Sequence, residues 1–249
     1  MIKPNPYGPD LAHIHDDGYG GFARDSASGL LSLLRKCGIP HGRIVDLGCG
    51  SGIFAKKLAD AGYQLIGVDI SAAMVELARR RVTQGTFYTG SLFAFCFPSC
   101  QAVTALGEVL NYCFDQTNSV ASLKRAYRNI FDALQPGGLL VFDVALPGRC
   151  RGREQAFAKG RDWACLIQYE HNLRARRLTR RITTFRRVGR TYRRSEEVHC
   201  QQLYEAETIR GMLRDAGFNV RQVRRFGRQQ LPEHVIGFIA RKRRVPEPS

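Results

Sequence analysis

Short apolar runs alternate with amphipathic stretches over the first 145 residues of the chain. The apolar runs predict five buried strands, near residues 43–47, 64–69, 85–89, 101–106 and 138–144. Apolar residues at helical spacing predict a leading helix and three intervening helices, near residues 22–37, 52–61, 72–81 and 119–134. Strands that alternate with helices in this way are typical of an α/β fold with a parallel sheet.

The pattern changes after Pro147-Gly148. β-branched and aromatic residues now sit among arginines, as in strands that expose one face to water. Three such strands are predicted, over residues 163–169, 177–187 and 192–204. They form an antiparallel insertion after the fifth strand. A helix over 205–216 and two final strands, over 218–226 and 234–241, then return to the first sheet as an antiparallel pair at its edge.

The predicted fold class is therefore α/β, with a doubly wound, Rossmann-like, mostly parallel sheet of seven strands and an antiparallel β insertion after strand 5. The predicted division of the chain is an N-terminal arm and leading helix (1–40), a ligand-binding core (41–147), the insertion (148–204) and a C-terminal completion of the core sheet (205–249). Residues 1–20 are rich in Pro, His, Asp and Gly and predict an irregular arm or a short helix.

A glycine-rich turn follows the first predicted strand. Gly48, Gly50 and Gly52 occupy alternate positions, where they permit positive φ and let a ligand approach the backbone. Asp69 ends the next strand, 21 residues after Gly48. A carboxylate at that distance accepts hydrogen bonds from ribose hydroxyls in doubly wound sheets. The unit therefore predicts a nucleoside-bearing ligand at the carboxyl ends of the strands.

The same turn argues against a dinucleotide. Ile53 stands where a dinucleotide turn needs its third glycine, which disfavours NAD. Asp46 begins the turn with a negative charge that would repel a pyrophosphate but tolerate a sulfonium and an ammonium group. The D-x-G-x-G-x-G spacing with a later acidic strand end resembles motif I of class I S-adenosylmethionine-dependent methyltransferases.

Further elements extend this resemblance over about residues 40–145, in the same order. Pro136-Gly137-Gly138 is similar to the turn before the family's fifth strand, and Gly90-Ser91-Leu92 to the segment beside the adenine. Ser91 replaces the family's usual Asp there, and Gln101 stands where the fourth strand often starts with Asp. The resemblance implies S-adenosylmethionine as cofactor, held by Asp46, Gly48, Cys49, Gly50, Asp69, Ile70, Met74, Gly90, Ser91, Leu92, Gly107 and Tyr19.

The insertion resembles the lid of small-molecule methyltransferases, including sugar-amine N-methyltransferases, and the run from Ser195 to Phe218 is similar to their return from lid to core. The resemblance implies in-line methyl transfer to an oxygen or nitrogen of a small acceptor beneath the lid. Proton transfer in such a reaction needs a base. The candidate catalytic residues are Glu108, Tyr112, His199 and His15, with Asn111 as a residue that orients the acceptor. Each has a structural alternative, as a loop anchor, a packing residue or a buried histidine.

Charge leaves two classes of partner open. The formal net charge is +16, and residues 149–194 hold fifteen lysines and arginines against three acidic residues. This segment is interpreted as a wet strand face, a site for a small acidic ligand, or a nucleic-acid surface, so that an RNA-directed methyltransferase is the alternative function. A non-catalytic protein that kept the cofactor pocket is a third reading.

Cysteine spacing and hydropathy bear on compartment. The eight cysteines show one C-x-x-x-C pair with no second pair or nearby histidine, which predicts neither zinc nor disulfides but buried thiols in a reducing compartment. No run of 18 apolar residues predicts a membrane span, and the start lacks a hydrophobic signal region. A cytoplasmic protein with no metal site is expected, and the sequence does not indicate an oligomeric state.

Overall fold

A seven-stranded sheet forms the centre of the computed structural model, which describes residues 6–115, 118–150 and 153–243. The strand order is β10-β13-β5-β4-β1-β2-β3. Its strands are β1 (Arg43–Leu47), β2 (Gln64–Asp69), β3 (Thr86–Thr89), β4 (Cys100–Ala105), β5 (Leu134–Ala145), β10 (Asn219–Val223) and β13 (Val235–Arg241). The first five pair in parallel, whereas β13 runs antiparallel to both β5 and β10. The predicted fold class is confirmed.

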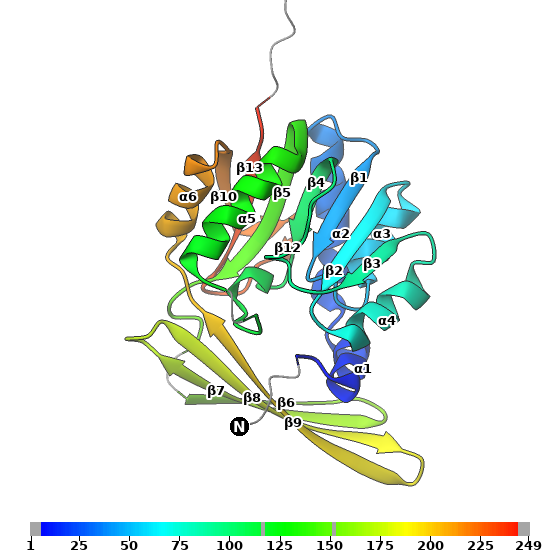
Figure 1. Cartoon of the computed structure of the whole chain (residues 1–249). Coiled ribbons are helices and arrows are strands. Elements are labelled where there is room, and N and C mark those ends of the chain that lie inside the picture. Colours follow the sequence, from blue (N-terminus) through cyan, green and yellow to red (C-terminus); the bar gives the residue numbers. More distant parts are fainter. Residues whose placement is uncertain (1–5, 116–117, 151–152, 244–249) are drawn as a thin grey trace, which may run out of the picture.

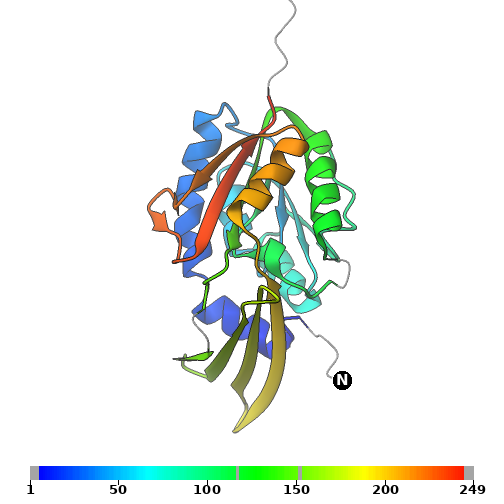
Figure 2. The same ribbon diagram turned by 90° about the vertical axis from the view of Figure 1, so that its left-hand side faces the viewer.

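Helices cover both faces of this sheet (Figure 2). Three pack on one face with the apolar cluster that contains Leu30, Leu58 and Val75, namely α2 (Gly21–Lys36), α3 (Ile53–Asp60) and α4 (Ala72–Arg81). On the other face lie α5 (Val120–Ala133) and α6 (Ala206–Asp215), around Tyr127 and Leu213. In the part of the chain that the structure describes, no helix has the length and apolar character needed to cross a membrane.

The insertion is a separate four-stranded antiparallel sheet beneath the core, in the order β6-β7-β8-β9 (Figure 1). Its strands are β6 (Arg153–Lys159), β7 (Trp163–Asn172), β8 (Arg177–Val188) and β9 (Thr191–Gln202). The prediction of three strands was wrong, because β6 was missed. That strand lies at the sheet edge with residues 154–157 exposed, so no buried face imposes an apolar alternation on its sequence. The four strands are called the lid.

The N-terminal arm contains a helix, α1 (Pro9–Gly18), that lies between core and lid. Leu11 and Ile14 pack against Trp163, Cys165 and Ile182 of the lid. The helix is therefore part of the lid's apolar core. Asp10 strengthens this attachment as the acceptor of a 2.6 Å hydrogen bond from Nε of Arg193.

The strand predicted over 218–226 is shorter and more divided than expected, whereas the strand predicted over 234–241 is confirmed as β13. The strand predicted over 218–226 ends at Val223, because Arg225–Phe226 (β11) leaves the sheet and pairs with Gln229–Gln230 (β12). This hairpin turns at Gly227, which has a φ of +61°. Gly29 of α2 packs against the turn so closely that a Cβ added at Gly29 would lie 2.5 Å from Cα of Gly227.

That contact predicts opposite effects for two glycines. Gly29→Ala should lower the free energy of unfolding by about 1 kcal/mol, because overpacking against backbone outweighs the gain in helix propensity. Gly211→Ala in α6, where a Cβ would meet nothing within 4 Å, should raise it by about 0.5–1 kcal/mol. Urea unfolding of both variants tests the pair. A Gly29→Ala protein as stable as Gly211→Ala would contradict the close approach.

Candidate active site

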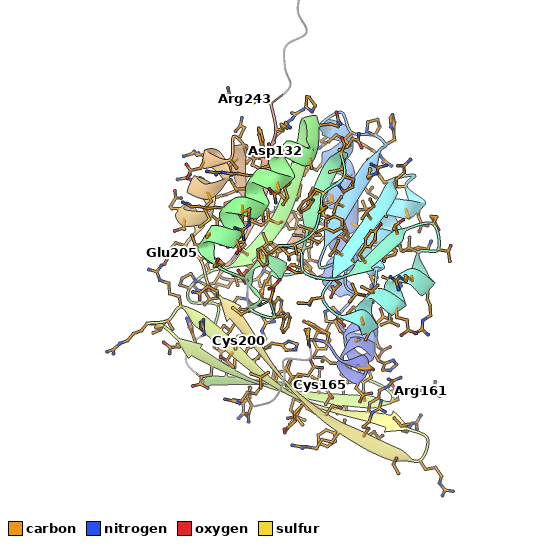
Figure 3. The ribbon with its side chains drawn as sticks, viewed as in Figure 1. Asp132, Arg161, Cys165, Cys200, Glu205 and Arg243 are labelled. Atoms are coloured by element: carbon orange, nitrogen blue, oxygen red, sulfur yellow. The ribbon has the colours of Figure 1, made fainter. Side chains whose placement is uncertain are left out.

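One cavity of about 450 Å³ lies between the carboxyl ends of the core strands and the lid. All sixteen residues predicted for the cofactor and for catalysis line it. Cys165 and Cys200 mark the lid strands beneath the core, and Glu205 marks the return to it (Figure 3). The cavity is therefore bounded above by the core and below by the lid, and its lid-side part, lined by Glu108, Tyr112, Arg149, Arg180 and His199, is called the acceptor chamber.

The glycine turn over residues 48–52 has the geometry of a ligand cradle. Gly48, Gly50 and Gly52 have φ values of +63°, +53° and +78°, which side chains strongly disfavour. A Cβ added at Gly50 or at Gly107, on the facing loop after β4, would meet no atom within 4 Å. Both glycines line the cavity, so a ligand can approach their backbone directly.

Asp69 is a buried carboxyl group in the wall of the cavity. Its Oδ2 accepts a 2.9 Å hydrogen bond from the amide of Gly50, and its Oδ1 accepts a 2.8 Å bond from the amide of Ser71. Burial raises the pKa of this carboxyl, and the two amides oppose that shift. Because each carboxylate oxygen has two lone pairs, both oxygens can still accept a hydroxyl of a bound sugar.

Asp46 places a second buried carboxyl in the same wall. It accepts a 2.7 Å hydrogen bond from the hydroxyl of Thr104. Burial raises the pKa of Asp46 to about 7, and the charge of Asp69 adds to the shift. A bound cation would compensate this carboxylate. The open glycines, the ribose-competent Asp69 and the cation-competent Asp46 together fit S-adenosylmethionine, which carries adenosine, sulfonium and ammonium groups.

Glu108 joins two arginines in the acceptor chamber. Its Oε1 lies 2.9 Å from Nε of Arg149, and its Oε2 lies 2.7 Å from Nη2 of Arg180 and accepts a 2.9 Å bond from Gln201. Burial raises the pKa of Glu108, but Arg180 and Arg149 more than offset this, so the pKa is lowered overall. Glu108 is therefore an ionised carboxylate with little tendency to take a proton.

The backbone beneath Glu108 is also fixed by a buried acid. Asp143, near the end of β5, accepts hydrogen bonds from the amides of Gly107 at 2.8 Å and Glu108 at 2.9 Å. Burial raises the pKa of Asp143 to about 7. Asn111, predicted to orient an acceptor, instead uses its amide on the backbone of Ala145 and Gln202 and holds the lid's last strand to the core.

His199 and Glu197 form a pair on the buried face of β9. His199 is 1% exposed, and its Nε2 lies 2.8 Å from Oε2 of Glu197. A carboxylate can only accept, so Nε2 carries a proton, and in the neutral form of the ring Nδ1 is the nitrogen with the lone pair. Nδ1 is buried and has no hydrogen-bond partner among the residues that the structure describes. Because His199 lines the cavity, this nitrogen is oriented without a competing donor from that part of the chain.

Glu197 also fixes the N-terminal arm. Its carboxylate accepts the amides of Tyr7 at 2.9 Å and Gly8 at 2.8 Å. The carbonyl of Tyr7 in turn accepts a 2.8 Å bond from the hydroxyl of Ser71 in the cofactor wall. Tyr7 adopts a φ of +49°, which is rare for tyrosine, and these three bonds maintain it. The arm therefore connects the core to the lid across the cavity.

Aromatic rings complete the chamber. Tyr112 stacks on Phe114 with ring centroids 4.8 Å apart, and its hydroxyl lies 3.2 Å from that of Tyr7. His15 of α1 lies against Tyr7 and stacks on Tyr19. Burial lowers the pKa of His15 to about 4, so this ring is neutral near pH 7. These rings form an aromatic wall of the chamber.

The sequence reading missed Arg180 and Glu197, and a signal for each was present. Arg180 alternates with Leu178 and Ile182, both buried, which places it on the inward face of a strand. Glu197 precedes His199 by two residues on one strand, so the two side chains share a face. The other arginines of β8 make the inward position of Arg180 hard to distinguish in the sequence.

Comparisons with known proteins show methyltransferases that are similar to this chain. A protein of Geobacillus sp. (strain WCH70), whose name classes it as a methyltransferase and gives no substrate, is 27% identical over 217 residues, covering 80% of this chain and 84% of its own. The 18S rRNA (guanine-N(7))-methyltransferase RID2 of Arabidopsis thaliana is 27% identical over 157 residues, covering 59% and 54%. The sugar N-methyltransferase KedS8 of Streptoalloteichus sp. shares the fold, with a TM-score of 0.78, 20% identity and coverage of 98% and 97%.

The fold is Rossmann-like, and the family match identifies a methyltransferase whose cavity fits S-adenosylmethionine as cofactor. The chain belongs to the methyltransferase domain family, whose model matches residues 19–223. The predicted enzyme class, class I S-adenosylmethionine-dependent methyltransferase, is thereby confirmed.

Proposed function

We propose that the enzyme methylates a nitrogen or hydroxyl oxygen of a small molecule held in the acceptor chamber. The observation that carries the proposal is a cavity that has the glycine turn in one wall and His199 of the lid in another. Its volume of about 450 Å³ lies in the range of small-molecule sites. The lid and the arm enclose the acceptor on the sides that the core leaves open.

S-adenosylmethionine supplies an activated methyl group. The protein's own tasks are to hold the acceptor in line, to exclude water and to remove the acceptor's proton. Nδ1 of His199 takes that proton, and Glu197 stabilises the imidazolium that results. Tyr7, Tyr112 and Phe114 surround the ring of His199, with centroids 4.8, 6.1 and 4.7 Å away. We assign cofactor contacts to the twelve residues predicted for them.

The other predicted catalytic residues take supporting roles in this proposal. Glu108 is a poor proton acceptor because its pKa is lowered, and it positions Arg149 and Arg180 instead. His15, with its pKa of about 4, serves as a neutral wall beside Tyr19. Tyr112 accepts a 2.8 Å hydrogen bond from Nη1 of Arg180, and its ring packs against the bound acceptor.

An RNA acceptor is the second candidate. It is favoured by the similarity to an rRNA methyltransferase and by the exposed aromatic residues Phe157 and Tyr192 among the lid's arginines. The ion pairs of the lid argue against an RNA acceptor, because several of the lid's arginines already pair with carboxylates of the protein. Arg186 and Arg193 pair with Asp10, and Arg149 and Arg180 pair with Glu108. This pairing reduces the charge that the lid offers to phosphates.

One experiment separates the two candidates. The protein is incubated with methyl-labelled S-adenosylmethionine and either the low-molecular-weight fraction or the total RNA of a cell extract. We expect label in small molecules and none in RNA. The exposed Arg181 of β8 gives the control, because Arg181→Gln should leave this transfer unchanged. Label in RNA alone, with binding that weakens steeply as salt rises, would establish the RNA candidate instead.

A further inference from the structure

We propose that the acceptor carries a carboxylate close to the atom that is methylated, and that Arg149 and Arg180 bind it. This inference rests on the proposed function, since it names the chemical class of the molecule in the acceptor chamber. The proposal is based on two guanidinium groups that line the cavity and that both pair with one carboxylate of the protein.

Arg180 occupies an unusual place for an arginine. Its neighbours on the same face of β8, Leu178 and Ile182, are buried, and its own side chain is only 16% exposed. The guanidinium carbon lies 5.8 Å from the ring centre of Tyr112 and 5.9 Å from that of Tyr169. Arginines are rarely buried unless a partner compensates the loss of water. The rings and Glu108 supply part of that compensation.

Arg149, Arg180 and Glu108 do not balance one another in charge. Two guanidinium groups face the single carboxylate of Glu108, so one positive charge is left over among these three residues. Arg149 gives only Nε to Glu108, and its two terminal nitrogens have no hydrogen-bond partner among the described residues. Those terminal nitrogens form the planar fork that binds a carboxylate in bidentate fashion.

The size of the imbalance favours a carboxylate over a phosphate. A carboxylate brings one negative charge and matches the one left-over positive charge. A phosphate monoester brings close to two at neutral pH, and the second would be opposed by Glu108 and by the ionised fraction of Asp143 beneath it. Both groups present the same anionic oxygens, so a measurement has to separate them.

The first measurement needs no acceptor. The melting temperature of the protein saturated with S-adenosylhomocysteine is compared in sodium acetate, sodium phosphate and sodium chloride at matched ionic strength. We expect acetate to raise the melting temperature of wild type and of Arg181→Gln above the chloride value. Arg149→Gln should need an acetate concentration about 10- to 100-fold higher to reach the same rise in melting temperature, as expected for the loss of a charged hydrogen bond. Equal curves in acetate and chloride would overturn the proposal, and a rise in phosphate alone would overturn the carboxylate assignment.

The second measurement uses turnover. Once an acceptor is found, its carboxylate is replaced by a carboxamide. We expect KM for the carboxamide to rise about 10- to 100-fold with a smaller change in kcat, and Arg149→Gln to produce the same rise for the natural acceptor. KM for S-adenosylmethionine should not change, which separates acceptor binding from a general loss of structure.

Arg180→Gln gives a second variant with a distinct signature, because among the described residues it leaves Glu108 with one arginine partner, Arg149, beside the neutral Gln201. We expect its KM for the acceptor to rise at least as much as that of Arg149→Gln. Methylation of neutral and anionic acceptors with equal KM would refute the carboxylate while leaving methyl transfer to small molecules intact. Absence of any methylated small molecule would instead refute the proposed function, so the two failures are distinguishable.

Discussion

His199→Gln is expected to lower kcat by about 10²- to 10⁴-fold, the usual contribution of a positioned general base. The loss should fall on the chemical step, because His199 lies in the lid and the cofactor cradle lies in the core. The dissociation constant of S-adenosylhomocysteine, measured by calorimetry, should remain that of wild type. Single-turnover kinetics with labelled cofactor measure the chemical step directly. An unchanged single-turnover rate would show that another group, or water, takes the proton.

Glu197 provides the matched test, as a positioning residue. Glu197→Gln should lower kcat by about 10- to 100-fold, the range seen for carboxylates that orient a functional histidine. If Glu197 acts through His199, the double variant should be no slower than His199→Gln alone. Losses that simply multiply would mean that Glu197 acts only by holding Tyr7 and Gly8 of the arm.

Asp69→Ala is expected to weaken binding of S-adenosylhomocysteine by about 10²- to 10⁴-fold, because two hydrogen bonds to a charged group are lost, each worth about 1.5–3 kcal/mol. The variant also releases the amides of Gly50 and Ser71, which loosens the cradle in the same direction. Calorimetric titration measures the effect.

Asp60→Ala is the control for Asp69→Ala. Asp60 is a half-exposed carboxylate that pairs with Lys56 on the surface of α3, so its loss should leave affinity unchanged. If wild type, Asp69→Ala and Asp60→Ala bind S-adenosylhomocysteine with equal affinity, Asp69 does not bind the ribose.

Much of this architecture was predictable because each element has a local cause. The core strands are buried on both faces and therefore appear as continuous apolar runs, such as that of β1. The glycine turn can be predicted from the spacing of its glycines, because glycine adopts a φ such as the +53° at Gly50 without strain. Strand ends in a doubly wound sheet converge at one edge, which is why the residues chosen from the core, such as Asp46, Asp69 and Gly107, line one cavity.

What could not be predicted depends on contacts between distant segments. The strand β6 has exposed residues and pairs only with β7, so its sequence resembles a loop. The bonds from Tyr7 and Gly8 to Glu197 join residues that are 190 and 189 positions apart in the sequence, and no local pattern predicts them. The two arginines on Glu108 arrive from β8 and from the loop after β5, and they change it from a candidate base into an anchor.

A crystal structure with bound S-adenosylhomocysteine tests the central claim most directly, namely that the cofactor in the glycine turn presents its methyl group to the acceptor chamber. We predict the ribose hydroxyls on Asp69, the amino acid portion near Asp46, and the sulfur atom facing the space between His199 and Arg180. A ligand whose ribose lies away from Asp69, or whose sulfur faces away from the lid, would contradict the account.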